Sequence, residues 1–232
     1  MTCADWLIET EFNLPYPQAL EKMQKAALTV KQNPQLKYLM ICSHPHCFTY
    51  GRGLQRKTNE DLCDLSLEQK KNLPFELYQV SRGGGLTFHY PGQIIIYPVL
   101  NFNQMKKSLA RLMVDLLKMS GEILQEQGLI ASFDYRQQLL GLWSEGKKIA
   151  SVGMNLERFV SQHGMALNFF QDSAFEQVMS QLSPCGISGQ NYHSVQHFFS
   201  ELSEQHREQF CQLWIEKFKN YLSSISTSTV SG

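Results

Sequence analysis

Three consecutive glycines, at positions 83 to 85, set the strongest limit on how this chain can fold. Glycine adds nothing to a core and loses the most backbone entropy on folding, so such a run indicates positive φ angles or a backbone that must stay unobstructed. It lies between two apolar stretches of strand composition, Phe75–Val80 and Ile94–Leu100, with Arg82 and His89 at its ends. This pattern predicts a glycine-rich loop at the mouth of a sheet, with a ligand against its backbone. A hairpin loop without a ligand is the alternative.

The length and charge of the chain exclude some classes of partner. Its 232 residues can bury a substantial core, and 21 basic residues balance 21 acidic ones. No overall field therefore draws nucleic acid or an anionic membrane to the surface. The first residues lack the basic and apolar regions of a signal peptide, and no apolar run is long enough to span a membrane. We expect a cytoplasmic protein that binds neither nucleic acid nor membrane.

The six cysteines are scattered without the regular spacing of a disulfide framework. In a reducing compartment this predicts free thiols. His44, His46 and Cys47 carry side chains that suit zinc, but adjacent residues seldom all point at one ion. No second Cys or His pair stands at zinc-finger distance, so we expect no metal site.

The rest of the chain mixes helices and strands. Helices are predicted where apolar residues recur at helical spacing, and strands where short apolar or alternating runs occur. The predicted helices run from Pro15 to before Pro34 and over 108–127, 173–182 and 201–222; the predicted strands cover 4–9, 37–42, 129–133, 139–143, 148–154 and 163–168. Because strands and helices do not alternate regularly, the expected class is α+β, a mixed α/β sandwich with the site on its loops.

One domain is expected over residues 1–222, because no linker or internal repeat interrupts the chain. Residues 54–73 are polar and charged, which predicts an exposed excursion with a short helical turn. Residues 223–232 are nearly all Ser, Thr and Gly, a composition that predicts a disordered tail.

Cys185 is the best candidate nucleophile. It stands between Pro184, which stiffens the approach, and Gly186, which leaves the sulfur and the next backbone N–H open. A nearby ammonium would favour the thiolate, and Lys148 can supply it if the hairpin that follows Ser144–Lys147 brings it close; Lys147 is the competing choice. His89 and His163, each in a polar loop beside glycine or its neighbours, could equally serve as the base.

Five ordered blocks of sequence resemble the octanoyltransferase family of lipoate biosynthesis, also called lipoate-protein ligase B. The blocks are Arg82 to His89, Pro91 to Gln93, Gly146 to Gly153, His163 to Asn168 and Pro184 to Gly186. Upstream, Ser43 to Pro45 and Thr49 to Arg52 are also similar to that family. The resemblance covers roughly residues 37–194, and five blocks in order are far more specific than one glycine loop.

The resemblance implies the fold of biotin and lipoate ligases, a mixed sheet with flanking helices, and an acyl transfer. An octanoyl group would pass from octanoyl-acyl carrier protein, through a thioester on Cys185, to a lysine ε-amine of lipoyl domains in 2-oxoacid dehydrogenase complexes and of the glycine cleavage H protein. Lys148 would lower the pKa of the thiol, and no cofactor is needed. The implied substrate contacts are Arg82, Gly83, Gly84, Gly85, Leu86, Thr87, Phe88, His89, Ser151, Val152, Gly153, Gly164, Met165 and Ala166.

Two residues depart from the family pattern. Tyr90 stands where a small residue is usual, and His193 where Thr is usual, which puts the width of the acyl pocket and the end of the Cys185 loop in question. Two other functions stay open. An ATP-dependent lipoate or biotin ligase would need no nucleophilic cysteine, and a non-catalytic binding protein for acyl carriers or lipoyl domains would tolerate loss of the thiol.

Overall fold

The structure is a computed structural model that describes residues 6–52, 73–135, 140–182 and 188–227. Its strands are β1 (Trp6–Glu11), β2 (Lys37–Cys42), β3 (Cys47–Tyr50), β4 (Leu77–Gln79), β5 (Leu86–His89), β6 (Gln93–Val99), β7 (Asp134–Tyr135), β8 (Gly141–Ser144), β9 (Lys147–Glu157) and β10 (Val160–Asn168). Its α-helices are α1 (Tyr16–Gln32), α3 (Leu109–Glu126), α4 (Ser173–Ser180) and α5 (Glu204–Thr227), with short 3-10 turns at Phe102–Gln104, Gly189–Asn191 and Val195–His197.

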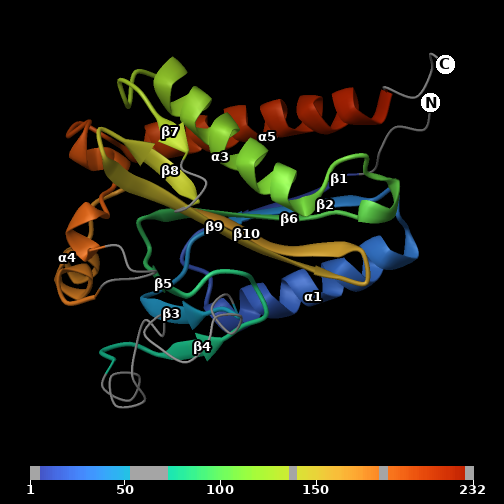
Figure 1. The fold of residues 1–232 in the computed structure, drawn as a ribbon, viewed down its shortest axis with the longest axis horizontal. Coiled ribbons are helices and arrows are strands. Elements are labelled where there is room, and N and C mark those ends of the chain that lie inside the picture. Colours follow the sequence, from blue (N-terminus) through green and yellow to red (C-terminus); the bar gives the residue numbers. More distant parts are fainter. Residues whose placement is uncertain (1–5, 53–72, 136–139, 183–187, 228–232) are drawn as a thin grey trace.

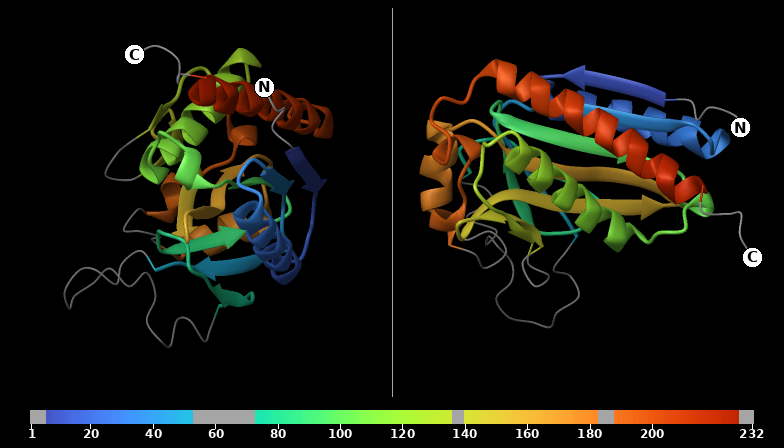
Figure 2. Two further views of the ribbon diagram at one scale, coloured as in Figure 1. Left: turned by 90° about the vertical axis from the view of Figure 1, so that its right-hand side faces the viewer. Right: turned by 90° about the horizontal axis from the view of Figure 1, so that it is seen from above.

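A seven-stranded mixed sheet forms the middle layer, with strand order β1-β2-β6-β10-β9-β8-β7. Helices α3 and α5 cover one face and α1 covers the other (Figure 1). Figure 2 shows α3 and α5 lying along the same face of the sheet. Strand alternation explains the two layers, because in β6 Ile94 and Ile96 pack under α3 and α5 while Ile95 and Tyr97 pack against α1. The predicted α+β class is confirmed.

A smaller sheet of order β4-β3-β5 lies on the α1 side of the main sheet (Figure 1). β3 pairs antiparallel with β5, so Cys47 lies opposite His89 and Tyr50 opposite Leu86. The glycine-rich loop connects β4 to β5. This places it between the small sheet and the main one, which is where a ligand could reach its backbone.

Local signals account for the elements that the sequence predicted. Ser108 caps α3 by accepting a hydrogen bond from the Arg111 N–H at 3.2 Å, and Gly128 ends that helix with a φ of +69°. Glu145 and Gly146 both have positive φ, 49° and 78°, which closes the β8–β9 hairpin with a turn whose twist matches the strands.

Three sequence predictions were wrong or incomplete. No strand covers 129–133. Leu129 and Ile130 are buried in the main core within an irregular segment, and only Asp134–Tyr135 pairs with another strand, β8. Strands β3 and β5 were missed, because their residues were assigned to loops. The tail was also wrong in part: residues 223–227 continue α5, where the Ser223 and Ser224 hydroxyls donate to the carbonyls of Lys219 and Tyr221 at 2.9 and 2.7 Å.

Hydrogen bonds from Ser223 and Ser224 to helix carbonyls satisfy these polar side chains within α5. The composition of the last ten residues was therefore a poor guide to where the helix ends. Residues 228–232, and all but Leu73 of the predicted excursion over 54–73, lie outside the described residues. Within the ranges that the structure describes, none of the helices is both long and apolar enough to cross a membrane.

Candidate active site

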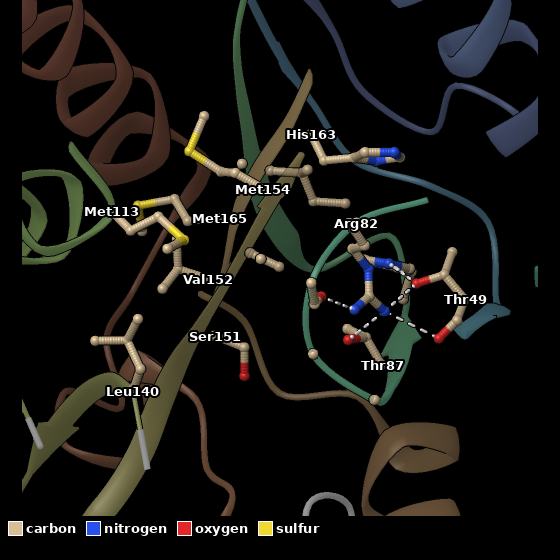
Figure 3. Close-up of a pocket in the computed structure, with 18 of the residues that line it drawn as sticks. Thr49, Arg82, Thr87, Met113, Leu140, Ser151, Val152, Met154, His163 and Met165 are labelled. Carbon is tan, nitrogen blue, oxygen red and sulfur yellow. Dashed lines mark hydrogen bonds between the residues drawn. The ribbon is translucent and has the colours of Figure 1, made fainter. Parts of the chain in front are cut away.

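A cavity of about 510 Å³, here called the main cavity, lies between the glycine-rich loop and strands β9 and β10 (Figure 3). Most of its wall is apolar or glycine. It is lined by Tyr16, Thr49, Arg82, Gly83, Gly84, Gly85, Leu86, Thr87, His89, Ile95, Tyr97, Met113, Leu140, Lys148, Ser151, Val152, Gly153, Met154, His163, Gly164, Met165, Ala166 and Tyr192. Such a space suits a long apolar chain whose polar end meets a few polar groups.

The glycine-rich loop packs directly on its neighbours, which explains part of its composition. The Gly83 N–H donates to the Met154 carbonyl at 3.0 Å, so the loop adds to the edge of β9 beyond the end of β8. A Cβ at Gly153 would stand 2.6 Å from the Gly83 carbonyl oxygen, and Gly84 has a φ of +81°. Backbone approach and positive φ are therefore both required here, in addition to any ligand.

Arg82 is buried in the wall of the main cavity rather than exposed on the surface, with 8% of its area accessible. Its guanidinium donates to the Thr49 hydroxyl at 2.7 Å, to the Thr49 carbonyl at 3.0 Å and to the Thr87 hydroxyl at 2.8 Å (Figure 3). A further bond runs to the Gly83 carbonyl at 2.9 Å. Arg82 thus holds the loop to β3 and β5 and gives this end of the cavity a positive charge.

Two buried histidines reach the same end of the cavity. Burial lowers the pKa of His163 to about 3 and holds the pKa of His89 well below its usual range, so both rings are neutral at pH 7. The two ring nitrogens of His89 already pair with the Gln93 amide oxygen at 2.9 Å and the Thr49 hydroxyl at 3.1 Å. His89 therefore has a structural role in the wall, and its position does not favour the base role considered from sequence.

Lys148 also lines the main cavity, five residues before Gly153 along β9, and is 5% exposed. Its ammonium nitrogen stands 5.8 Å from the centre of the Trp143 ring and 5.4 Å from that of Tyr192. Aromatic faces attract a cation, so these two rings favour the ammonium in this buried position. The neighbouring Lys147 points outward, with its nitrogen 3.5 Å from the Gln190 carbonyl. The tertiary structure thus distinguishes the two lysines that the sequence left open.

The structure brings together most of the residues named from sequence. Lys148, Arg82 to Thr87, His89, Ser151 to Gly153 and Gly164 to Ala166 all line the main cavity. Phe88 does not, because strand alternation in β5 turns its ring toward Phe48, 4.8 Å away between ring centres, in the aromatic cluster behind the loop. Cys185 lies outside the described residues.

The two departures from the family pattern do not narrow the main cavity. Tyr90 is fully buried in the aromatic cluster, 4.9 Å from the Phe175 ring, and its hydroxyl donates to the Phe170 carbonyl at 3.1 Å. The His193 N–H donates to the Lys148 carbonyl at 3.1 Å, while its ring packs 4.2 Å from that of His197. Tyr90 therefore anchors α4, and the backbone of His193 anchors the segment after residue 187 to β9.

Sequence reasoning missed several residues of this site. Tyr192 lines the cavity and forms an isolated bridge with Lys148, although no local signal marked it. Thr49 binds Arg82 and His89 from a segment that looked like a loop. Met113 belongs to the apolar stripe of α3, and the sequence could not show that this part of the stripe borders a cavity.

Gly141 also positions Lys148, which gives a specific prediction. A Cβ at Gly141 would collide with the Lys148 Cε and stand 3.2 Å from its nitrogen and 2.6 Å from the Ala150 carbonyl oxygen. A displacement of a reacting group by about 1 Å can lower a reaction rate about 100-fold. We therefore expect Gly141→Ala, in the folded protein, to lower by about 100-fold the rate of a reaction that depends on the Lys148 amine. Gly121→Ala is the control, because its Cβ would collide only with the Phe133 ring, away from the cavity. Equal activity of the two folded variants would contradict the role of Gly141.

The two histidines considered as zinc ligands have other partners. His44 pairs with the Leu14 carbonyl at 2.7 Å and the Tyr97 hydroxyl at 3.2 Å, and His46 pairs with both Asp172 oxygens at 3.0 Å. In the part of the chain that the structure describes, no three His, Cys, Asp or Glu side chains gather as a metal site. Cys42, Cys47 and Cys211 are buried free thiols, and burial raises the pKa of Cys47 and of Cys211 to about 12, which makes them poor nucleophiles.

Comparison with known proteins agrees with this architecture. Residues 15–221 match the family described as the lipoyl protein ligase A/B catalytic domain. The chain is 31% identical over 200 residues to an octanoyltransferase of Bacteroides fragilis, which covers 82% of this chain and 86% of the relative. The fold is similar to a bipartite lipoate protein ligase of Thermoplasma acidophilum (TM-score 0.63, 13% identity, 95% of this chain and 85% of that one). It is also similar to biotin protein ligase of Aquifex aeolicus in complex with biotin and ATP (TM-score 0.50, 14% identity, 94% and 72%).

Together the fold and the matches define an acyltransferase with the fold of lipoate and biotin ligases. The chain belongs to the lipoyl protein ligase A/B catalytic-domain family, and the similar curated proteins include octanoyltransferases. The resemblance noted from five sequence blocks is confirmed. The two solved structures, at these identities, support the fold alone.

Proposed function

We propose that this enzyme transfers an octanoyl group from octanoyl-acyl carrier protein to Cys185 and then to a lysine of a lipoyl domain. The observation that supports it most is the place of Lys148, a buried amine that lines a cavity whose wall is mostly apolar or glycine. Burying an alkyl chain there contributes about 0.8 kcal/mol of binding free energy for each CH₂ group, so the cavity can select donors by the length of their acyl chain. The relatives named octanoyltransferase support the octanoyl group.

The described residues on either side of Cys185 support its role as nucleophile. The Gly189 N–H donates to the Leu182 carbonyl at 3.0 Å, which ties the two ends of the intervening segment together. Three residues further on, Tyr192 bridges to Lys148. These contacts join the described segments that precede and follow Cys185 in sequence to each other and to the strand that carries the buried amine.

The proposed chemistry needs no other activating group. The Cys185 thiolate attacks the thioester carbonyl of the donor, and the carbon–sulfur bond to the carrier breaks. The carrier sulfur leaves as a thiolate and takes the proton of the Lys148 ammonium, which leaves Lys148 neutral. One thioester replaces another, so the step is nearly balanced in free energy. The acceptor amine then forms the amide bond as the Cys185 thiolate departs. That amine must first lose a proton, which neutral Lys148 can accept.

The acceptors expected from the resemblance are lipoyl domains of 2-oxoacid dehydrogenase complexes and the glycine cleavage H protein. The alternative, an ATP-dependent ligase, is an enzyme on a similar fold, and the T. acidophilum structure is a lipoate protein ligase with its E2 lipoyl domain. That ligase reaction would produce pyrophosphate exchange with ATP and no adduct on a cysteine. The motif around Cys185 favours the transferase.

Intact mass spectrometry after mixing the protein with octanoyl-acyl carrier protein tests the proposal. We expect an added mass of one octanoyl group that maps to Cys185, is removed by hydroxylamine, and passes to a lipoyl domain. A protein that stays unmodified, yet octanoylates a lipoyl domain only with ATP and free octanoate, would instead be a ligase.

A further inference from the structure

A second cavity, of about 150 Å³, lies beside α4 and is here called the α4 cavity. A small space of about 30 Å³ separates it from the main cavity. That space shares Thr87 and Ser151 with the main cavity and Phe175 and Met179 with the α4 cavity, and Tyr192 lines all three. The three spaces therefore form a row, and the Tyr192 side chain stands where they meet.

The α4 cavity differs from the main cavity in its chemistry. Its wall carries the carboxylates of Asp172 and Glu176 and the amide of Gln190. Ser194 also lines it, and the hydroxyl of this residue, which is only 4% exposed, has no hydrogen-bond partner. Buried hydroxyls are nearly always paired, so an unpaired one marks a position where a polar group can bind. Carboxylates and a hydroxyl oxygen together suit a donor with positive charge.

The two carboxylates are not equivalent. Asp172 already accepts from His46 at 3.0 Å and caps α4 by accepting from the Phe175 N–H at 2.8 Å. Glu176 is exposed and lines the cavity together with His193. Its charge acts to raise the pKa of His193, against the larger effect of burial, which lowers it. Glu176 is therefore the carboxylate that can meet an incoming cation.

The position of the α4 cavity relates it to the proposed nucleophile. Met179 and Ser180 line it from the end of α4, and Gly189 and Gln190 line it from the next 3-10 turn. These residues precede and follow Cys185 in the sequence. The amine that discharges a thioester on Cys185 must arrive by a route that the acyl chain, in the main cavity, does not fill.

We propose that the α4 cavity receives the side chain of the acceptor lysine, with Glu176 drawing in its ammonium group. This proposal rests on the proposed function and adds a separate entrance for the second substrate. The Ser194 hydroxyl accepts a hydrogen bond from the ammonium as it passes. One proton then moves to Lys148, and the amine nitrogen forms the amide bond to the octanoyl carbonyl. The Cys185 sulfur leaves with the electrons of the broken carbon–sulfur bond and takes the second proton that the nitrogen gives up.

Discharge of the acyl-enzyme by different amines tests the proposal. Wild type, Glu176→Gln and Glu176→Lys are loaded from octanoyl-acyl carrier protein and then mixed with a lipoyl domain, with Nα-acetyl-lysine methylamide, or with hydroxylamine, which is small and uncharged at pH 7.5. We expect loading and hydroxylamine discharge to stay within about twofold of wild type. For both lysine-bearing acceptors, we expect the concentration that gives half-maximal discharge to rise about fivefold in Glu176→Gln and by more in Glu176→Lys. High salt should reduce both increases, because it screens the charge of Glu176.

Glu157→Gln is the matched control, since Glu157 is an exposed carboxylate at the far end of β9 and should leave all three discharges unchanged. Unchanged discharge by both lysine acceptors in the Glu176 variants would overturn the proposal, as would an equal loss with hydroxylamine. An effect on the lipoyl domain but not on the lysine analogue would make this face a domain-docking surface instead. A wild-type enzyme that never loads would count against the proposed function itself, and this proposal would fall with it.

Discussion

Cys185→Ala is expected to abolish octanoyl transfer, by at least about 10⁴-fold, while the protein remains folded. Removing a covalent nucleophile leaves only binding and electrostatic terms, and the losses measured for such groups are of this order or larger. The role proposed for this thiol is chemical, so we expect the melting temperature to stay within a few degrees of wild type. The measurements are steady-state transfer to a lipoyl domain, intact mass after donor addition, and thermal unfolding.

The other cysteines supply the controls for that result. Cys42, Cys47 and Cys211 are buried, and burial raises the pKa of each thiol, so none is poised as a thiolate near neutral pH. Their alanine variants should keep the octanoyl adduct and lose only stability. An adduct that persists in Cys185→Ala and disappears in one of these variants would show that the nucleophile has been misassigned.

Lys148→Arg is expected to separate the two half-reactions, so that octanoyl-enzyme accumulates and a lipoyl domain discharges it at least about 100-fold more slowly. A permanent cation can still support the Cys185 thiolate during loading, but Arg does not give up its proton and cannot accept one from the incoming amine. The losses typical of removing a general base are about 10²–10⁴-fold. Rapid-quench mass spectrometry measures the loading and discharge rates separately.

Two further variants make this test specific. Lys148→Gln removes the charge altogether, so alkylation of Cys185 should shift toward the higher pH of an ordinary thiol. Lys147→Arg changes the outward-pointing neighbour and should leave both half-reactions intact. Discharge at the normal rate by Lys148→Arg would refute the base role of Lys148. The larger guanidinium has little room beside Gly141, so loss of loading as well would point to displaced geometry rather than to chemistry.

Much of the architecture could be predicted because its signals are local. The capped apolar stripe of α3, the turn of the β8–β9 hairpin and the buried strand β2 each depend on residues within one segment. The predictions failed where distant contacts decide the structure. β3 and β5 pair with each other across 35 intervening residues, and Leu129 and Ile130 are buried without belonging to any strand.

The sequence by itself identified the family and the glycine-rich loop and suggested Cys185 as the nucleophile, because ordered motifs can be recognised without knowledge of the fold. Only the tertiary structure showed that Lys148 rather than Lys147 enters the cavity, since the face of a strand on which a side chain falls depends on pairing register. In the same way, alternation in β5 turns Phe88 away from the cavity, and packing of α4 takes Tyr90 out of it. Tyr192, Thr49 and Gly141 join the site because chain segments far apart in sequence meet there, and no local pattern records such a meeting.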